Sequence, residues 1–179
     1  LMSDMKFSDG DVLDVNEFCQ PKGEGEIAFI LKKDLQGPGV TNADTLAATD
    51  YLLPAFEIVD SRIDNWQIKI QDTVADNASA GAFVLGSKKI KPQLVNLTEC
   101  QMTLKKNGEV IGVGSGAATM GNPITAVTWL ANKLGDLGIK LEAGEVILSG
   151  ALSAMFPIRV GDELHMEISQ IGQLSCKFR

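Results

Sequence analysis

The chain has 179 residues, 45% of them hydrophobic and 22% charged, which is the balance of an ordinary globular protein with a sizeable core. Its formal net charge of −7 argues against nucleic acid or an anionic membrane surface as the main partner. No apolar stretch approaches the roughly 20 residues that a membrane helix needs, and three scattered cysteines without a CxxC pair indicate neither a zinc knuckle nor a disulfide framework, so we expect a cytoplasmic protein.

The first part of the sequence predicts strands around one short helix. Residues 1–20 combine short apolar pieces with turn residues, and we expect a strand, a turn and an irregular entry there. The run 24–31 is apolar and rich in Ile and Phe, which is typical of a strand. Thr41, with Asp44 three residues later, resembles a capping box, so we expect a helix from Thr41 to near Pro54.

The middle of the sequence predicts further strands and one hairpin. Short apolar runs indicate strands at 55–62, 69–74 and 82–85. Asn107-Gly108, the strongest hairpin signal in the chain, separates the strand-like runs 102–106 and 109–113. The glycine-rich segment 112–116 lacks the Gly-Lys-Ser/Thr ending of a phosphate loop, and we interpret it as a tight turn or bulge beside the hairpin.

The last third predicts a second helix and more strands. Asn122-Pro123 supplies an N-cap and a first-turn proline, apolar residues continue at helical spacing to Leu137, and Gly138 ends the helix. Residues 146–148 are apolar, and 163–169 alternate strictly between apolar and polar. Many strands with two clear helices indicate an α+β, mainly β fold, with residues 1–179 forming one domain.

Three carboxylates lie where ionised groups are least stable. Glu24 and Glu26 are two residues apart in a predicted strand, so they share one face about 7 Å apart at roughly 3.3 Å per residue. Glu57 is alone inside a second apolar run, where a carboxylate needs a positive partner. Two other interpretations stay open: the pair is a solvated strand end, and Glu57 forms a salt bridge with Arg62 or Lys69.

The residue types favour one hard divalent cation. Three carboxylates completed by water suit octahedral Mg²⁺ or Mn²⁺. The chain has one histidine, which excludes a His-rich zinc site. That residue, His165, falls on the polar side of the alternating strand, so hydrolysis by a Ser-His-Asp or Cys-His arrangement is not indicated.

Four motifs in fixed order resemble a known family. They are PKGEGEIAF at 21–29, PAFEIVDSR at 54–62, DTVADNAS at 72–79 and LSGAL at 148–152. Together they are similar to the 2-keto-4-pentenoate hydratase branch of the fumarylacetoacetate hydrolase superfamily, in which the 4-oxalocrotonate decarboxylases are near relatives. The resemblance runs from Leu1 to the C-terminus, and it implies a fumarylacetoacetase C-terminal-like mixed β roll or sandwich with a few helices.

The resemblance also implies roles for particular residues. Glu24, Glu26 and Glu57 would bind Mg²⁺ or Mn²⁺, and the 2-oxo acid end of a small substrate would chelate the metal. The other implied site residues are Ser79 and Asp76 as catalytic groups and Ser79, Asn77, Arg62, Ser149 and Gly150 as substrate contacts. Members of the family usually form homo-oligomers, and a complex with a related decarboxylase or hydratase is also implied.

Three features depart from the family pattern. The family's catalytic lysine segment and one aspartate would precede Leu1, and because the chain does not begin with Met we expect a native N-terminal segment before it. Asn122 stands where the family has the histidine of Gly-His-Pro. Gly23 and Gly25 replace a bulky residue and an alanine, and two flexible glycines predict a weaker metal affinity.

The expected activity is metal-dependent hydration of 2-hydroxypenta-2,4-dienoate to 4-hydroxy-2-oxopentanoate in aromatic meta-cleavage catabolism. One alternative is a 4-oxalocrotonate decarboxylase, which must hold a second, distal carboxylate, with Lys69 and Arg159 as the candidate bases. The other alternative is a non-catalytic partner subunit of such an enzyme complex.

Overall fold

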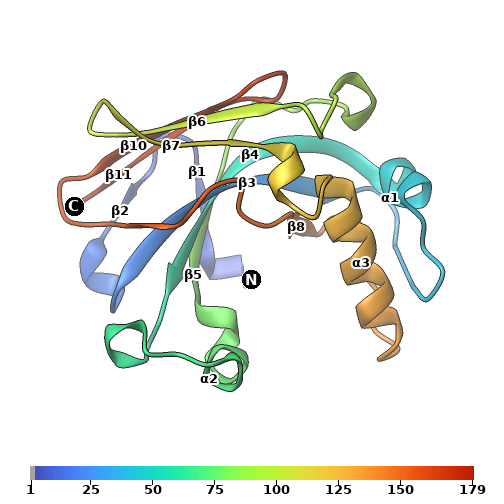
Figure 1. The fold of residues 1–179 in the computed structure, drawn as a ribbon, viewed down its shortest axis with the longest axis horizontal. Helices are drawn as coiled ribbons and strands as arrows, with labels where there is room; N and C mark the ends of the chain where they lie inside the picture. The colour runs from blue at the N-terminus through green and yellow to red at the C-terminus, as the bar shows by residue number, and fades with distance from the viewer. Residues whose placement is uncertain (1–2) are drawn as a thin grey trace.

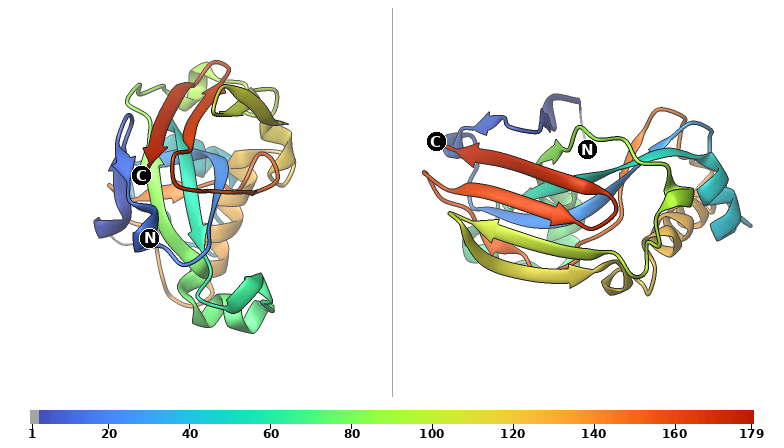
Figure 2. Two further views of the ribbon diagram at one scale, coloured as in Figure 1. Left: turned by 90° about the vertical axis from the view of Figure 1, so that its left-hand side faces the viewer. Right: turned by 90° about the horizontal axis from the view of Figure 1, so that it is seen from above.

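Two β-sheets pack against each other, with helices to the side (Figure 1). The computed structural model describes residues 3–179. The first sheet has the order β1 (Lys6–Ser8), β5 (Ala80–Leu85), β4 (Thr49–Asp60), β3 (Pro21–Leu31) and β8 (Val146–Leu148), and β9 (Phe156–Pro157) also pairs with β3. The second has the order β2 (Val12–Leu13), β11 (Gly172–Phe178), β10 (Glu163–Ile168), β6 (Gln101–Lys106) and β7 (Glu109–Ser115). Seen from above, the second sheet lies over the first (Figure 2).

The helices are short. They are α1 (Asn42–Ala48), α2 (Ile70–Ala75) and α3 (Pro123–Gly135), with 3₁₀ turns at Ser3–Met5, Val15–Glu17, Asp64–Trp66, Asn77–Ser79, Pro92–Leu94 and Gly116–Ala118. α1 packs against α3, where the hydroxyls of Thr45 and Thr128 are hydrogen-bonded at 2.8 Å. Across residues 3–179, no helix has the length and apolar character needed to cross a membrane.

Most of the core lies between the two sheets. Phe29 and Phe56 of the first sheet and Leu104 and Met166 of the second are fully buried there. The opposite face of the first sheet carries a second apolar cluster, formed by Ala28, Ile30, Leu53, Ala55, Phe83 and Leu85. Both faces of β3 and β4 are therefore covered, which is why their sequences are continuous apolar runs rather than alternating patterns.

The mainly β fold, the hairpin, the second helix and the C-terminal strands are confirmed. Asn107 and Gly108 have φ angles of 54° and 85°, as a two-residue hairpin turn requires. The Asn122 side chain accepts the Ile124 N–H at 3.0 Å and caps α3, which ends at Gly135. β1, a turn and β2 form the expected N-terminal entry, although its first two residues lie outside the described part of the chain.

The first predicted helix is shorter than expected. The Asp44 carboxylate accepts the Thr41 N–H at 2.8 Å, so the predicted cap is confirmed. The helix ends at Ala48 rather than near Pro54, because the residues that follow pair with β3 and form β4. Pairing between two long strands outweighs local helix propensity at this point.

The strand predicted at 69–74 is wrong, since these residues form α2. The Asp72 carboxylate accepts the Lys69 N–H at 2.8 Å and caps the helix. Ile70 and Val74 are 70% and 72% exposed, so their apolar side chains face no sheet. Local capping therefore determines the structure of a segment that buries little apolar surface.

The tight turn predicted at 112–116 is wrong, but an irregularity lies where the segment begins, since Gly112 pairs with Leu104 and Val110 pairs with Lys105. The segment is the end of β7 and the start of a 3₁₀ turn. A Cβ on Gly114 would overlap the Leu152 carbonyl group, and one on Gly116 would overlap the Leu97 carbonyl group. These glycines are required because another part of the backbone crosses each of them at contact distance.

We expect Gly114→Ala to lower the free energy of unfolding by about 1–3 kcal/mol, because the added methyl group must displace backbone atoms. The matched control is Gly112→Ala on the same strand, whose Cβ would meet the Ser153 Oγ at 3.2 Å, the end of a side chain that can rotate. Urea unfolding of both variants measures the difference. An equal loss of stability in the two would contradict the prediction.

Asp162 ties the turn before β10 to the hairpin. Its carboxylate accepts the Arg159 N–H at 2.8 Å, the Asn107 amide at 3.0 Å and the Lys106 ammonium at 3.3 Å. Burial acts to raise the pKa of Asp162, but the hydrogen bonds from Asn107, Arg159 and Lys106 outweigh it and leave the pKa below its ordinary value. The ionised form therefore stabilises the folded state.

Asp162→Asn is expected to destabilise the protein by about 1–3 kcal/mol at neutral pH. Because the folded-state pKa is lowered, this stabilisation is complete above the unfolded pKa of about 3.9 and is lost as the pH falls through the folded pKa. The difference in the free energy of unfolding between the wild type and the variant should therefore disappear at acidic pH. Unfolding at pH values on both sides of the unfolded pKa tests this, with the exposed Asp64→Asn as control. A difference in the free energy of unfolding that does not change with pH would show that the carboxylate charge does not contribute to stability.

Candidate metal centre

The three predicted metal ligands meet on the outer face of the first sheet. In the antiparallel pair of β3 and β4, Glu24 lies directly opposite Glu57, and Glu26 lies one diagonal step away, opposite Ala55. The carboxylate oxygens of the three glutamates lie within 4.8 Å of one another. This spacing allows all three to reach a single ion.

Gly23 and Gly25 alternate with the glutamates because the inner face of β3 leaves no space for side chains. A Cβ on Gly25 would lie 2.5 Å from the Met102 sulfur and 2.7 Å from the Met166 sulfur, both in the second sheet. A Cβ on Gly23 would overlap the ring of Phe156. The glycines thus bring β3 into direct contact with the side chains behind it, beneath the carboxylates.

Burial makes the three carboxylates difficult to ionise. Glu26 is 1% exposed, and desolvation together with the nearby Glu57 charge raises its pKa well above the ordinary range, although the Gly150 N–H acts in the opposite direction. Burial and the Glu57 charge raise the pKa of Glu24. Burial likewise raises the pKa of Glu57. The site therefore favours a bound proton or a bound cation.

The alternative salt bridge of Glu57 is not formed among residues 3–179, where the ion pairs involve other carboxylates. The Arg62 guanidinium lies 3.5 Å from the Asp76 carboxylate instead, and it donates to the carbonyls of Asp60 and Ala80. A cluster of buried carboxylates without a basic partner is stabilised when a cation binds. Three carboxylate oxygens also form the kind of donor set that hard divalent cations take.

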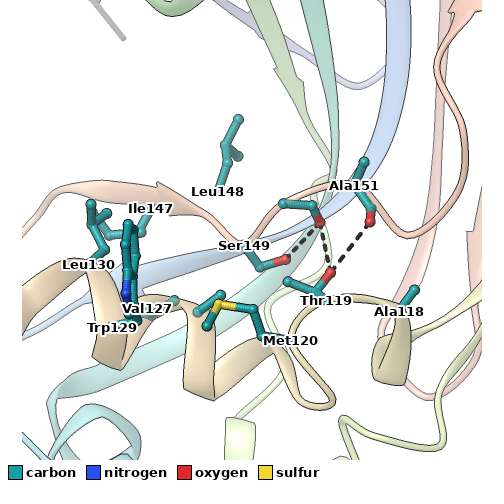
Figure 3. A pocket seen from close by; sticks show the side chains of 12 residues that line it. Ala118, Thr119, Met120, Val127, Trp129, Leu130, Ile147, Leu148, Ser149 and Ala151 are labelled. Atoms are coloured by element: carbon teal, nitrogen blue, oxygen red, sulfur yellow. Dashed lines mark hydrogen bonds between the residues drawn. The ribbon is translucent and has the colours of Figure 1, made fainter. Parts of the chain in front are cut away.

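The loop after β8 fixes one of these carboxylates. The Gly150 N–H donates to Glu26 Oε2 at 2.6 Å, and Gly150 has a φ of +102°, which L side chains rarely adopt. Ser149 is tied to β3, because its N–H donates to the Ile27 carbonyl at 3.1 Å. The Thr119 hydroxyl donates to the Gly150 carbonyl at 3.1 Å (Figure 3). The two site residues predicted from the late motif thus lie beside the glutamates.

Four other predicted site residues lie away from the glutamates, at one end of the first sheet. The Asp76 carboxylate accepts the Arg62 N–H at 3.1 Å and the Ser79 hydroxyl at 3.3 Å. Ser79 is 2% exposed, and Asn77 begins the left-handed turn that leads to it, with a φ of 52°. β5 follows Ser79 and pairs with β4, so this cluster lies at the strand end beyond Glu57.

Two cavities adjoin near the glutamates, and only the first is lined by any of them. The first, of about 330 Å³, is lined by Glu26, Glu57, Leu130, Val146, Ile147, Leu148 and Gly150. The second, of about 470 Å³, lies between α3 and the loop after β8 and shares Leu130, Ile147, Leu148 and Gly150 with the first (Figure 3). The sequence marks the leucines and the isoleucine only as apolar positions, because periodicity does not tell which of them lie over a site.

Comparisons with known proteins identify the family to which the chain belongs. Residues 6–179 match the family model described as fumarylacetoacetate (FAA) hydrolase C-terminal. The chain is 52% identical over 180 residues to a 2-hydroxyhexa-2,4-dienoate hydratase of Comamonas testosteroni, covering 99% of this chain and 68% of the relative. It is 57% identical over 136 residues to a 2-hydroxypent-2,4-dienoate hydratase of Pseudomonas putida, covering 75% of this chain and 61% of the relative.

A solved structure is similar over the whole chain. It is a 4-oxalocrotonate decarboxylase from Pseudomonas putida G7 complexed with magnesium and adipate, with a TM-score of 0.96 and 36% identity, covering 100% of this chain and 68% of that one. This chain thus spans about two thirds of the length of these proteins. Because the family model covers nearly all of the sequence, the chain belongs to the fumarylacetoacetate hydrolase family.

Proposed function

We propose that this chain forms the metal- and substrate-binding core of a hydratase that adds water to 2-hydroxypenta-2,4-dienoate, giving 4-hydroxy-2-oxopentanoate. The observation that carries the proposal is a cluster of three carboxylates that form no ion pair with Lys, Arg or His within residues 3–179 and that border a cavity with aliphatic walls. Relatives named as hydratases of short 2-hydroxydienoates, at 52% and 57% identity, support this reaction. We place the enzyme in the cytoplasmic catabolism of aromatic ring-cleavage products, acting as a homo-oligomer on a small 2-oxo acid.

We assign Glu24, Glu26 and Glu57 as the ligands of Mg²⁺ or Mn²⁺. The all-carboxylate donor set and the spacing of at most 4.8 Å between the oxygens suit a hard cation. The magnesium complex of the similar decarboxylase supports the assignment. When bound, the cation would polarise the oxygens of the 2-oxo acid and stabilise the negative charge that develops there.

The residues around the glutamates orient one metal ligand and exclude water from the place where the cation and the substrate would bind. The hydrogen bond from the Gly150 N–H holds the Glu26 carboxylate in one orientation before any ligand arrives. Leu130, Ile147 and Leu148 form the apolar wall of the cavity and exclude water from its side. Electrostatic interactions are stronger where water is excluded, so this wall increases the effect of each nearby charge.

For proton transfer we propose Ser79 and Asp76, with Arg62, Asn77 and Ser149 as further substrate contacts. The Ser79 hydroxyl already donates to the Asp76 carboxylate at 3.3 Å, which is the arrangement in which the carboxylate can take its proton. Arg62 donates to the same carboxylate from its backbone N–H at 3.1 Å and so fixes its position. Residues 1–179 form a single catalytic domain in this proposal.

A decarboxylase acting on a 2-oxo-3-enedioate is the second candidate, favoured by the TM-score of 0.96 to a 4-oxalocrotonate decarboxylase. A cation held by the same three glutamates would also stabilise the negative charge left on the substrate after loss of CO₂. Such an enzyme must also hold a second carboxylate at the far end of the substrate. The relatives named as hydratases are 52% and 57% identical to this chain, whereas the decarboxylase is 36% identical, and we therefore place hydration first.

Glu26→Gln is expected to weaken Mg²⁺ or Mn²⁺ binding at least about tenfold, because one ligand is lost. In the metal-free protein the same change replaces a buried carboxyl group, whose ionisation the site opposes, with a neutral amide, so the melting temperature should rise. Calorimetric Mn²⁺ titration and thermal unfolding with and without Mg²⁺ measure the two effects.

The control for this variant is Glu109→Gln, an exposed position with the same change of charge. Unchanged metal binding in Glu26→Gln would refute the assignment. Crystals grown with Mn²⁺ give an independent check, since anomalous density away from the three glutamates would also refute it.

We expect the full-length protein to hydrate 2-hydroxypenta-2,4-dienoate with incorporation of solvent oxygen and to lose this activity when a chelator removes the metal. Product analysis in ¹⁸O-labelled water, beside CO₂ release from 4-oxalocrotonate, separates the two candidate activities. Faster CO₂ release would favour the decarboxylase, and no turnover of either compound would favour a non-catalytic subunit.

A further inference from the structure

Lys22 lies on the same face of β3 as the carboxylate cluster. Side chains alternate along a strand, so Lys22 shares the outer face of the first sheet with Glu24 and Glu26. The intervening Gly23 and Gly25 face the core. Lys22 precedes Glu24 by one place on the outer face, about 7 Å along the strand at roughly 3.3 Å per residue. The strand itself therefore places a basic residue beside the glutamates.

The residues that pair across the sheet from Lys22 lead to the other predicted site residues. Lys22 lies opposite Val59 of β4, and Val59 lies opposite Ala80 of β5. Ser79 immediately precedes Ala80 in the chain. The three strands lie side by side in the first sheet (Figure 1). Lys22 thus occupies the row of side chains next to the row of the glutamates, on the side toward Ser79.

An aromatic ring holds the Lys22 ammonium in place. Its nitrogen lies 4.1 Å from the centroid of the Trp66 ring, which makes a cation–π contact. The Trp66 indole is itself fixed, because its N–H donates to the Gln20 carbonyl at 3.0 Å. Lys22 is half-buried. A cation that is already held in this way loses less conformational freedom when an anion binds to it.

The charge of Lys22 is not neutralised by the protein. Among residues 3–179, no carboxylate forms an ion pair with Lys22. An ion pair with Glu24 would compete with a metal for the same oxygens, but the ammonium is turned to Trp66 instead. Three ionised glutamates and one divalent cation leave a negative charge at the site, and a 2-oxo acid brings another. The positive charge of Lys22 offsets this excess, so the acid is not repelled.

We propose that Lys22 is a substrate-binding residue that receives the carboxylate of the 2-oxo acid while the three glutamates hold the cation. This inference rests on the proposed function, because it takes the glutamates as the metal ligands and a 2-oxo acid as the substrate. The ammonium donates a charge-assisted hydrogen bond to a carboxylate oxygen. Lys22 therefore makes the site select an acid over an uncharged amide or ketone of the same shape.

The test measures the binding of the cation and of the acid separately, by calorimetry on the full-length protein. Lys22→Met should weaken the binding of 2-oxopentanoate in the presence of Mg²⁺ at least about tenfold, because the carboxylate loses its charged partner. The same variant should bind Mn²⁺ alone about threefold more tightly, since it removes a positive charge about 7 Å from Glu24. 2-Oxopentanamide keeps both carbonyl oxygens but carries no charge, so it should bind the two proteins equally.

Two further variants serve as controls. Lys22→Arg should retain most of the affinity for the acid, because a guanidinium keeps both the charge and the contact with Trp66. Lys89→Met is the matched control, since the Lys89 ammonium lies 4.4 Å from the centroid of the Tyr51 ring, at the far end of the β3–β4 pair. It removes the same charge and the same kind of contact, and it should leave both affinities unchanged. Lys22→Gln repeats the measurement if the methionine variant does not fold.

Equal affinity of the wild type and Lys22→Met for 2-oxopentanoate would overturn the role of Lys22 and leave the proposed function in place. A parallel loss of Mn²⁺, acid and amide binding would overturn it too, because it indicates a damaged site rather than a lost charge. Failure of the wild type to bind 2-oxopentanoate with Mg²⁺ would instead refute the proposed function, and the role of Lys22 with it.

Discussion

Glu24 faces Glu57 across the β3–β4 pair, and the carboxylate cluster depends on this register. Side chains alternate along a strand, so a slip of one residue in β3 would turn its glutamates inward and its glycines outward. Met102 and Met166 lie where any inward side chain at position 25 would have to go. The core between the two sheets therefore determines where the negative charges meet.

The same arrangement links the stability of the protein to what it binds. Glu26 is 1% exposed on β3, between apolar clusters on the two faces of the first sheet, and its charge there opposes folding. The apolar clusters on both sides of the first sheet supply the stability that tolerates this charge. A ligand that neutralises the cluster binds the folded chain and not the unfolded one, so it stabilises the fold by mass action.

Much of the fold is predictable because the signals are local. The run 24–31, the Asn107-Gly108 turn and the Asn122 cap each contain the information that determines their structure. That Glu24 and Glu26 share a face follows from strand alternation alone. By contrast, the end of α1 depends on the pairing of β4 with β3, and the strand at 112–115 depends on the backbone that crosses Gly114.

The candidate site is only partly predictable for the same reason. Residue type and setting identify the three glutamates, but the 4.8 Å limit on their separation is a property of strand pairing. The hydrogen bond from the Gly150 N–H to Glu26 joins positions that are 124 residues apart, which no periodicity reports. Leu130 follows the pattern of any apolar helix position, and only the packing of α3 places it over the glutamates.

Gly150 takes part in both cavities, and this gives the loop after β8 a second property. Its N–H is bonded to Glu26 and its carbonyl to Thr119, so occupants of the two cavities act on the same peptide unit. If a ligand in one cavity shifts the preferred position of the Gly150 peptide unit, it changes the affinity of the other cavity for its ligand. The ligand in the second cavity then changes the affinity of the first by the same factor. Under the proposed function, the cation at Glu26 and a ligand in the second cavity are then cooperative, and a ligand that fits poorly retains the metal less firmly as well.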